Sequence, residues 1–160
     1  MIRLATTADL DAILGVYAHA RAFMAEHGNP SQWGTTYPAV VIVEEDIRLD
    51  RLYVDEQDGA VCGVFMFDIG DDPTYGYIED GKWNDPSPYG VIHRVASNGA
   101  VPGTLGRCLD FCRGKISHLR IDTHADNYPM QHLLAKLDFT RCGIVYMEDG
   151  TPRIAYEWTK

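Results

Sequence analysis

The residues best suited to chemistry lie where an apolar strand gives way to a helix. Ala100–Gly106 reads AVPGTLG, between the apolar run Val91–Ser97 and a helical pattern. Amide groups at a helix start have no partners within the helix, and the helix dipole is positive there, so such a loop can hold an anion. The loop contains no acidic residue and Arg107 follows it, although Pro102 removes one donor. An ordinary strand-to-helix turn, with Gly103 for tightness, explains the same residues.

A second strand-to-helix segment follows. Leu119–Thr123 is a predicted strand, and Asn127 precedes Pro129 at a predicted helix start, where it can cap the helix or contact a ligand. Both predicted helices have apolar residues at helical spacing, which should form their buried faces. These faces are Leu105, Cys108, Leu109 and Cys112 on the first helix, and Met130, Leu133, Leu134 and Leu137 on the second.

Histidine and aromatic residues are the remaining candidates for a site. Period-two alternation places His93, Val95 and Ser97 on one face of a strand, with Ile92, Arg94 and Ala96 on the other. His93 fits a general base or an ordinary interior histidine. Four aromatic residues in loops fit a substrate pocket, or they pin the loops to the core: Trp33, Tyr37, Tyr77 and Trp83.

The composition predicts one domain, residues 1–160, with an ordinary core. The apolar fraction is 46%, and 14 Lys and Arg stand against 23 Asp and Glu, a formal charge of −9. This balance disfavours nucleic-acid binding and favours cationic partners such as amines, although most acidic domains are simply soluble. The N-terminus has no basic, apolar leader and no run approaches the roughly 18 apolar residues of a membrane span. We therefore expect a cytoplasmic protein without a membrane partner.

The four cysteines show no paired Cys-x-x-Cys spacing and lie in or beside apolar runs, so we expect buried thiols: Cys62, Cys108, Cys112 and Cys142. Two chemical alternatives use cysteine or histidine. One is a Cys–His hydrolase that pairs Cys108, Cys112 or Cys142 with His93 or His124. The other is a metal site of Asp122, His124 and His132. Neither has a spacing that demands it, so we expect no metal.

Periodicity and turn residues predict a mixed α/β domain. Ile2–Ala5 is a strand, Thr6–Asp9 a capping box, and the helix behind it should end near His27-Gly28. A loop that exposes Trp33 and Tyr37 leads to Pro38, which can open a second helix with Val40, Val43 and Ile47 inside. The other expected elements are a hairpin of Leu52–Asp55 and Val61–Phe67 around Gln57-Asp58-Gly59, strands Thr74–Ile78, Val91–Ser97, Leu119–Thr123, Cys142–Met147 and Arg153–Trp158, and a turn at Glu148–Gly150.

The pair of strand-loop-helix units resembles the coenzyme A half of GNAT-type N-acetyltransferases. The pyrophosphate loop of these enzymes is commonly Arg/Gln-x-x-Gly-x-Gly/Ala. Gly103 matches the first glycine, whereas Ala100 replaces the Arg or Gln, Leu105 replaces the second glycine, and Gly106 follows one position late.

The rest of the chain resembles a group of bacterial GNAT proteins. These carry, in this order, the Arg-Ile-Asp-Thr-His stretch that ends at His124, then Asp-Asn, Met-Gln and a Cys-Gly-Ile strand. Asn29–Pro38, Tyr77–Trp83 and His93–Ser97 fit the same group, so the resemblance covers nearly the whole chain. One departure is Asp138, which stands where a glycine usually precedes Phe139.

The resemblance implies the GNAT fold: a central, mixed, mostly antiparallel twisted sheet of six to seven strands, flanked by about four helices and splayed at the two central strands. It implies direct transfer of an acetyl group from acetyl-CoA to a primary amine of a small molecule or peptide. It also allows a homodimer. The residues it assigns to the coenzyme are Val95, Ala96, Ser97, Gly103, Thr104, Leu105, Gly106, Arg107 and Asn127.

The resemblance also implies catalytic roles. His93 would be the base, with Glu79 and His124 as alternatives, and a strand amide near Val95 would stabilise the developing negative charge. The tyrosine that usually protonates the leaving thiolate is Leu134 here, so either Tyr128 or Tyr146 substitutes for it, or the thiolate leaves without assistance. The acceptor pocket would use Trp33, Tyr37, Tyr77, Trp83 and His124. The main alternative is a GNAT-shaped protein that binds an acyl-CoA without turnover.

Overall fold

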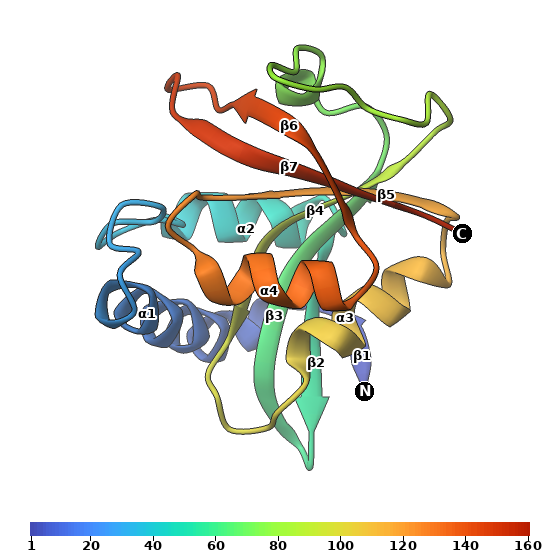
Figure 1. Cartoon of the computed structure of the whole chain (residues 1–160). Helices are drawn as coiled ribbons and strands as arrows, with labels where there is room; N and C mark the ends of the chain where they lie inside the picture. Colours follow the sequence, from blue (N-terminus) through green and yellow to red (C-terminus); the bar gives the residue numbers. More distant parts are fainter. The chain divides into compact units, whose positions relative to one another are not determined.

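The computed structural model describes all 160 residues, and its strands and helices are drawn in Figure 1. The chain divides into two compact units. The first unit contains Met1–Phe67 and His93–Phe111, and the second contains Asp68–Ile92 and Cys112–Lys160. The chain enters each unit twice, so neither unit is one continuous segment. The strand β4 (Gly90–Ser97) and the helix α3 (Thr104–Arg113) each contribute residues to both.

The first unit contains two antiparallel strand pairings, of which one is a hairpin, and two helices. Strand β1 (Ile2–Leu4) pairs antiparallel with β2 (Leu52–Gln57), which pairs antiparallel with β3 (Ala60–Ile69), and the order continues to β4. A 3-10 turn η1 (Thr7–Asp9) leads into helix α1 (Leu10–Glu26), and helix α2 (Val40–Arg48) follows. The core between these elements is apolar, and includes Ile13, Val16, Tyr17, Val43, Leu52 and Val64.

The second unit continues the sheet in the order β4-β5-β7-β6. Strand β5 (His118–Thr123) pairs parallel with β4 and antiparallel with β7 (Pro152–Thr159), which pairs antiparallel with β6 (Thr140–Tyr146). A 3-10 turn η2 (Pro73–Tyr75) lies in the long connection before β4, and helix α4 (Tyr128–Lys136) lies between β5 and β6. The hairpin of β6 and β7 is drawn in orange-red and red in Figure 1.

These strands and helices confirm the predicted fold class: seven strands in a mixed, mostly antiparallel sheet, with four α-helices. The parallel pairing joins residues 90–92 of β4 to residues 119–121 of β5. Beyond Ile92 the strand belongs to the first unit, and the predicted splay of the two central strands stays a prediction.

Several local predictions are confirmed. Asp58 and Gly59 both have positive φ, 52° and 79°, which is the backbone of a type I′ hairpin turn. The Asp9 carboxylate accepts a hydrogen bond from the Thr6 amide at 2.8 Å, as expected of a capping box. Helix α1 ends at Glu26, and the four residues predicted to form the buried face of α3 are all buried: Leu105, Cys108, Leu109 and Cys112.

One predicted strand is wrong because local polar contacts outweigh residue propensity, and the second predicted helix is present but starts later than expected. There is no strand at residues 74–78. The Asp72 carboxylate accepts hydrogen bonds from the Thr74 amide (2.8 Å) and hydroxyl (2.6 Å), which fixes the 3-10 turn η2 instead. Helix α2 begins at Val40, not at Pro38, and Val40 is exposed, whereas Asp46 is buried beside Val43 and Ile47.

Three side chains also differ from their predicted surroundings. Trp33, expected to be exposed, is 8% exposed because it packs edge-on against Tyr17 in the core of the first unit. Leu133 of α4 is exposed, since this helix has nine residues and buries mainly Leu134. The regular alternation expected in β4 is interrupted at Arg94, whose φ is 53°.

Candidate functional site

The loop before α3 presents three backbone amides without partners in the helix. The first i to i−4 bond of this helix runs from the Arg107 amide to the Gly103 carbonyl at 3.1 Å. The amides of Thr104, Leu105 and Gly106 therefore precede the hydrogen-bonded turns of the helix. This is the arrangement that the sequence predicted for anion binding.

The loop itself is held by its own side chains. The Ser97 hydroxyl accepts a hydrogen bond from the Gly99 amide and the Asn98 side chain accepts one from the Ala100 amide, both at 3.0 Å. Gly103 has φ 88°, and a Cβ atom added there would lie 3.1 Å from a guanidinium nitrogen of Arg107. Left-handed backbone and limited space thus both favour glycine at this position.

Arg107 lies in the first turn of α3, as predicted, but its guanidinium is already engaged. It donates to the Asp55 carboxylate (2.8 Å), to the Pro102 carbonyl (2.7 Å) and to the Thr104 hydroxyl (3.3 Å). Arg107 therefore connects the loop and the helix start to strand β2. Its charge is balanced by a buried carboxylate, so the positive potential of the loop comes mainly from amides.

The Asp55 carboxylate is fully buried in the first unit. Burial opposes its ionisation, but hydrogen bonds from Gln57 (2.7 Å) and Arg107 outweigh burial and lower the pKa of Asp55. Burial, followed by the charge of Asp55, raises the pKa of Cys62, whose thiol donates to Asp55. At neutral pH this cluster is thus an ionised aspartate next to a protonated thiol.

Strand β4 supplies the predicted base and the predicted backbone contacts in the first unit. His93, Val95 and Ser97 are half-buried, and Ala96 is buried in the apolar core. Between them, Arg94 has left-handed backbone and forms an ion pair with buried Asp46 of α2. Ion pairs of Arg94 and Arg107 with buried aspartates therefore flank the strand end that carries these residues.

The aromatic residues predicted for the first unit lie near Arg94. Trp33 packs against Tyr17 and Tyr37, with ring centroids 5.6 and 6.2 Å apart. Tyr37 is partly exposed, and its hydroxyl accepts a hydrogen bond from Arg94 at 3.3 Å. Trp33 therefore fits the alternative prediction, in which a large side chain attaches its loop to the core, whereas Tyr37 is accessible to solvent.

In the second unit, the structure brings together three predicted site residues, Tyr77, Glu79 and Tyr146. The Tyr146 hydroxyl donates a hydrogen bond to the Glu79 carboxylate, and the rings of Tyr77 and Tyr146 lie 6.4 Å apart. This hydrogen bond, followed by burial, raises the pKa of Tyr146. Tyr77 is 64% exposed, so the cluster is open to solvent.

Close backbone contact holds this cluster against β6. Glu79 and Ile144 exchange two backbone hydrogen bonds of 2.8 Å, and the Lys82 amide donates to the Cys142 carbonyl at 3.0 Å. A Cβ atom on Gly81 would lie 1.8 Å from the Cys142 carbonyl oxygen, and one on Gly143 would lie 2.6 Å from the Glu79 oxygen. Only glycine allows this approach.

Trp83 packs inside the second unit. Its indole donates to the Tyr75 carbonyl at 2.9 Å, and the Arg120 guanidinium lies 4.1 Å from its ring centroid. The Arg120 guanidinium also lies 4.0 Å from the ring centroid of Tyr89. A cavity of about 510 Å³ beside Arg120 is lined by residues 69–73, 75–76 and 86–89. Trp83 therefore matches the alternative of a loop pinned to the core, and its role in an acceptor pocket stays a prediction.

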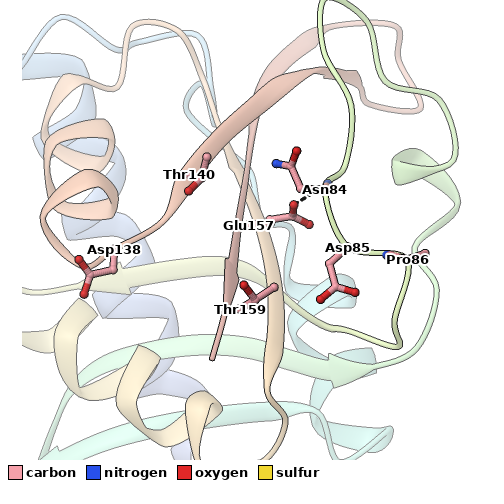
Figure 2. Close-up of a pocket in the computed structure, with 7 residues that line it drawn as sticks. All are labelled: Asn84, Asp85, Pro86, Asp138, Thr140, Glu157 and Thr159. Atoms are coloured by element: carbon pink, nitrogen blue, oxygen red, sulfur yellow. Dashed lines mark hydrogen bonds between the residues drawn. The ribbon is translucent and has the colours of Figure 1, made fainter.

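A second cavity, of about 350 Å³, surrounds buried Glu157 of β7 (Figure 2). Both carboxylate oxygens of Glu157 are already bonded, one to the Asn84 amide (2.6 Å) and the other to the His118 ring (2.9 Å). Glu157 thus holds a loop and strand β5 together. The cavity is lined by Asn84, Asp85, Pro86, Asp138, Thr140, Glu157 and Thr159.

Three further predicted residues surround the start of α4. Asn127 caps the helix, because its side chain accepts from the Met130 amide at 3.3 Å, and Tyr128 is exposed. The His124 ring accepts from the Asp126 amide at 3.0 Å. Leu134, which stands at the position of the usual acid, is fully buried.

The cysteine and metal alternatives gain no support. All four cysteines are buried, and none of them forms a disulfide. Burial raises the pKa of Cys112 to about 12 and, together with Glu157, that of Cys142 to about 12, so neither is a thiolate at neutral pH. No group of three or more His, Cys, Asp or Glu side chains is placed to hold a metal ion. The helices are also too short or too polar to cross a membrane.

The sequence did not reveal the two buried aspartates, Asp46 and Asp55, that anchor Arg94 and Arg107. The only sequence signal for these buried aspartates is a charged residue close to apolar ones, as in the segments VIVEEDIR and LYVDEQ. The Tyr75 hydroxyl bond to Asp122 (2.7 Å) was also missed.

Comparison with solved structures places this geometry in a family. A GNAT-family acetyltransferase from Streptococcus agalactiae 2603 is 32% identical, with a TM-score of 0.89 over 100% of this chain and 95% of that one. A Staphylococcus aureus Mu50 protein described as a candidate acetyltransferase is 27% identical, with a TM-score of 0.71 over 99% and 98%. The fold also matches yncA from Salmonella typhimurium, solved with its cofactor acetyl-CoA, at 18% identity and a TM-score of 0.61 over 99% and 92%.

No family model matches the chain, and no curated protein matches it. The identity and complete coverage of the streptococcal structure nevertheless define the class: an acetyltransferase fold of the GNAT type. The chain belongs to the GNAT family, as the resemblance of its sequence predicted.

Proposed function

We propose that the chain transfers the acetyl group of acetyl-CoA to a primary amine of a small molecule or peptide. The proposal depends on three amides at the start of helix α3, those of Thr104, Leu105 and Gly106. They follow Gly103, whose backbone is left-handed. The chain that carries them belongs to an acetyltransferase family. Amides at a helix start suit the diphosphate of a coenzyme. A neighbour of the same fold binds acetyl-CoA.

In this proposal the loop and strand β4 bind the coenzyme mainly through the backbone. Gly103, Thr104, Leu105 and Gly106 supply amides to the diphosphate, and Arg107 keeps the loop in shape. Backbone groups of Val95, Ala96 and Ser97 bind the pantetheine arm. Because the contacts are amides, the poor match to the usual loop pattern does not prevent binding.

His93 acts as the base in the proposed reaction. An amine with a pKa of roughly 10 is mostly protonated at neutral pH, so His93, directly or through water, removes a proton from the ammonium group. The nitrogen lone pair forms the new C–N bond, and an amide near Val95 stabilises the negative carbonyl oxygen. The C–S bond then breaks, the new amide nitrogen loses its second proton to solvent, and the coenzyme leaves as a thiolate that takes up a proton.

The proton for the thiolate has no obvious donor at the usual position, because Leu134 is apolar and buried there. Tyr146 is a poor acid, since its hydroxyl donates to Glu79 and its pKa is raised. Exposed Tyr128 or solvent is the better source. A thiol pKa near 8.5 makes the thiolate a tolerable leaving group without help.

A thiol-release assay with acetyl-CoA tests turnover. Polyamines, aminoglycosides, aromatic amines, amino acids and peptides with free N-termini should be compared as acceptors. Amine-dependent release of coenzyme A thiol, with an acetylated product by mass spectrometry, is the expected result. Tight acetyl-CoA binding with no release for any amine would instead support the alternative, an acyl-CoA-binding protein, which the buried Leu134 favours.

Calorimetry with Gly103→Val tests the loop. Valine disfavours the left-handed backbone and would crowd Arg107, so acetyl-CoA affinity should fall by about tenfold or more. Gly150→Val is the matched control, because Gly150 has a similar φ of 83° in the turn between β6 and β7, with open space around it. Unchanged affinity in Gly103→Val, with Gly150→Val also normal, would contradict a coenzyme site at this loop.

A further inference from the structure

Arg94 is the only residue other than glycine that has left-handed backbone within a strand. Its φ is 53°. The other four such residues are aspartates in turns or bends: Asp50, Asp58, Asp80 and Asp138. Aspartate tolerates this conformation because its short side chain bonds locally, whereas arginine has no such advantage. A strained residue inside a strand persists only when its surroundings hold it there.

The surroundings of Arg94 hold both its side chain and its backbone. The guanidinium donates two hydrogen bonds to the Asp46 carboxylate, at 2.8 and 2.9 Å, and Asp46 is 1% exposed. A third donor of Arg94 reaches the Tyr37 hydroxyl at 3.3 Å. The hydroxyl of buried Tyr17 donates to the Arg94 carbonyl at 3.0 Å. Helices α1 and α2 and the loop between them thus all contact this one residue.

Left-handed backbone within a strand turns the flanking peptide groups away from the regular ladder, as in a β-bulge. The residues that flank Arg94 are His93 and Val95, which the proposed function uses as the base and as the amide donor. If Arg94 adopted extended backbone, its guanidinium would move away from Asp46, which is buried and held in place. The ion pair would then break, and breaking a buried ion pair is costly.

We infer that Arg94 is a positioning residue, which holds His93 and the Val95 amide in place through the Asp46 ion pair and the left-handed backbone. This inference rests on the proposed function. The side chain of Arg94 acts on the backbone and not on substrate. Tyr37, which is partly exposed, links the loop between α1 and α2 to the same arrangement.

A matched pair of variants separates the backbone from the side chain. Arg94→Ala and Arg94→Gly both remove the guanidinium and leave Asp46 with Arg51, whose side chain is 2.8 Å away. Only glycine adopts the left-handed conformation without strain. We expect kcat to fall by about 100-fold in Arg94→Ala, the effect of misplacing one oxyanion donor, with KM for acetyl-CoA nearly unchanged. Arg94→Gly should recover about tenfold of that loss.

Equal losses of kcat in the two variants, a loss confined to KM, or full activity in Arg94→Ala would each overturn the inference. If Arg94→Ala does not fold, Tyr17→Phe decides, because it removes only the hydrogen bond to the Arg94 carbonyl. It should lower kcat by about tenfold, and unchanged kcat in that variant would overturn the inference.

A second readout separates this inference from the proposed function. If the wild-type protein transfers no acetyl group, the proposed function fails, and calorimetry then compares acetyl-CoA with coenzyme A that has a free thiol. A well-placed amide should favour the thioester, so Arg94→Ala should lose this preference and Arg94→Gly should keep it. A preference that is absent in the wild-type protein, or the same in all three proteins, would overturn the positioning role.

Discussion

Two regions that carry predicted site residues are fixed in different ways. In the first unit, residues 94–107 are held by side chains: Arg94 and Arg107 form ion pairs with the buried carboxylates of Asp46 and Asp55. In the second unit, residues 78–82 are held by the backbone, through the bridge between Glu79 and Ile144 and the close approach of Gly81.

The difference indicates what each region can present to a ligand. In the first region, the charged side chains that fix the loop are already bonded within the protein, so backbone amides are the groups that remain for binding a ligand. Where the backbone fixes the segment, side chains such as Tyr77, Glu79 and Tyr146 stay near the surface. The first region therefore offers backbone amides, which suit an anion, and the second offers side chains.

The comparison would break if the second region did not depend on backbone contact. Gly81→Ala places a methyl group 1.8 Å from the Cys142 carbonyl oxygen, so the segment must move. We expect a loss of about 3 kcal/mol in the free energy of unfolding, measured by urea denaturation. Gly76→Ala is the control, because its methyl group would meet only the Pro73 carbonyl at an ordinary 3.5 Å, and it should cost about 0.5 kcal/mol. Equal effects would contradict close packing at Gly81.

A second test asks which region supplies the base. His93→Ala should lower kcat by about 100-fold and remove the acidic limb of the pH–rate profile, because a general base contributes this much. Glu79→Gln, in the second region, should leave that limb in place. His27→Ala, an exposed histidine stacked on Phe23, controls for loss of a histidine in general. The opposite pattern would assign the base to Glu79.

The pH dependence of stability should differ between the regions. The pKa of Asp55 is lower in the folded chain than its usual value, so its contribution is present above about pH 4 and is lost as pH falls through the folded pKa. The pKa of Tyr146 is raised, so its contribution is present below about pH 10 and is lost as pH rises further.

Thermal melts from acid to alkaline pH measure both effects. Asp55→Asn should flatten the acid side alone, and Tyr146→Phe should flatten the alkaline side alone. A melting temperature with the same pH dependence in Asp55→Asn and wild type would show that the Arg107 ion pair does not stabilise the first region.

The smallest expected effect concerns the turn after α4, which no ion pair or glycine fixes. Asp138 has φ 68°, and the Phe139 amide bonds the Leu134 carbonyl (2.9 Å) while the Asp138 amide bonds that of Ala135 (3.2 Å). This is a Schellman motif, in which glycine is preferred at the left-handed position. Asp138→Gly should raise the free energy of unfolding by about 0.5 kcal/mol, and Asp138→Ala should lower it by about 1 kcal/mol. The reverse order in chemical denaturation would rule out this motif.

Much of the fold was predictable because its signals are local. The Asp58-Gly59 turn, the start and end of α1 and the buried face of α3 each depend on a few neighbouring residues. The failures occurred where distant residues decide. Trp33 is buried because Tyr17 lies against it, and strand β4 departs from alternation because Asp46 holds Arg94.

The candidate site divides in the same way. The glycine loop before α3 was found from its sequence, since amides at a helix start follow from local geometry. Tyr77 and Glu79 lie beside Tyr146, although Glu79 and Tyr146 are 67 positions apart in the chain. No spacing rule reaches that far.

The sequence by itself determined most of the strands and helices, the glycine loop before α3 and the family, because these depend on periodicity, turn residues and short motifs. Only the tertiary structure decided how charge is used. Asp46 and Asp55 are buried next to Arg94 and Arg107, so these two arginines form ion pairs inside the first unit. A buried carboxylate requires a partner, and which cation becomes that partner is settled by packing between elements that are far apart in the chain.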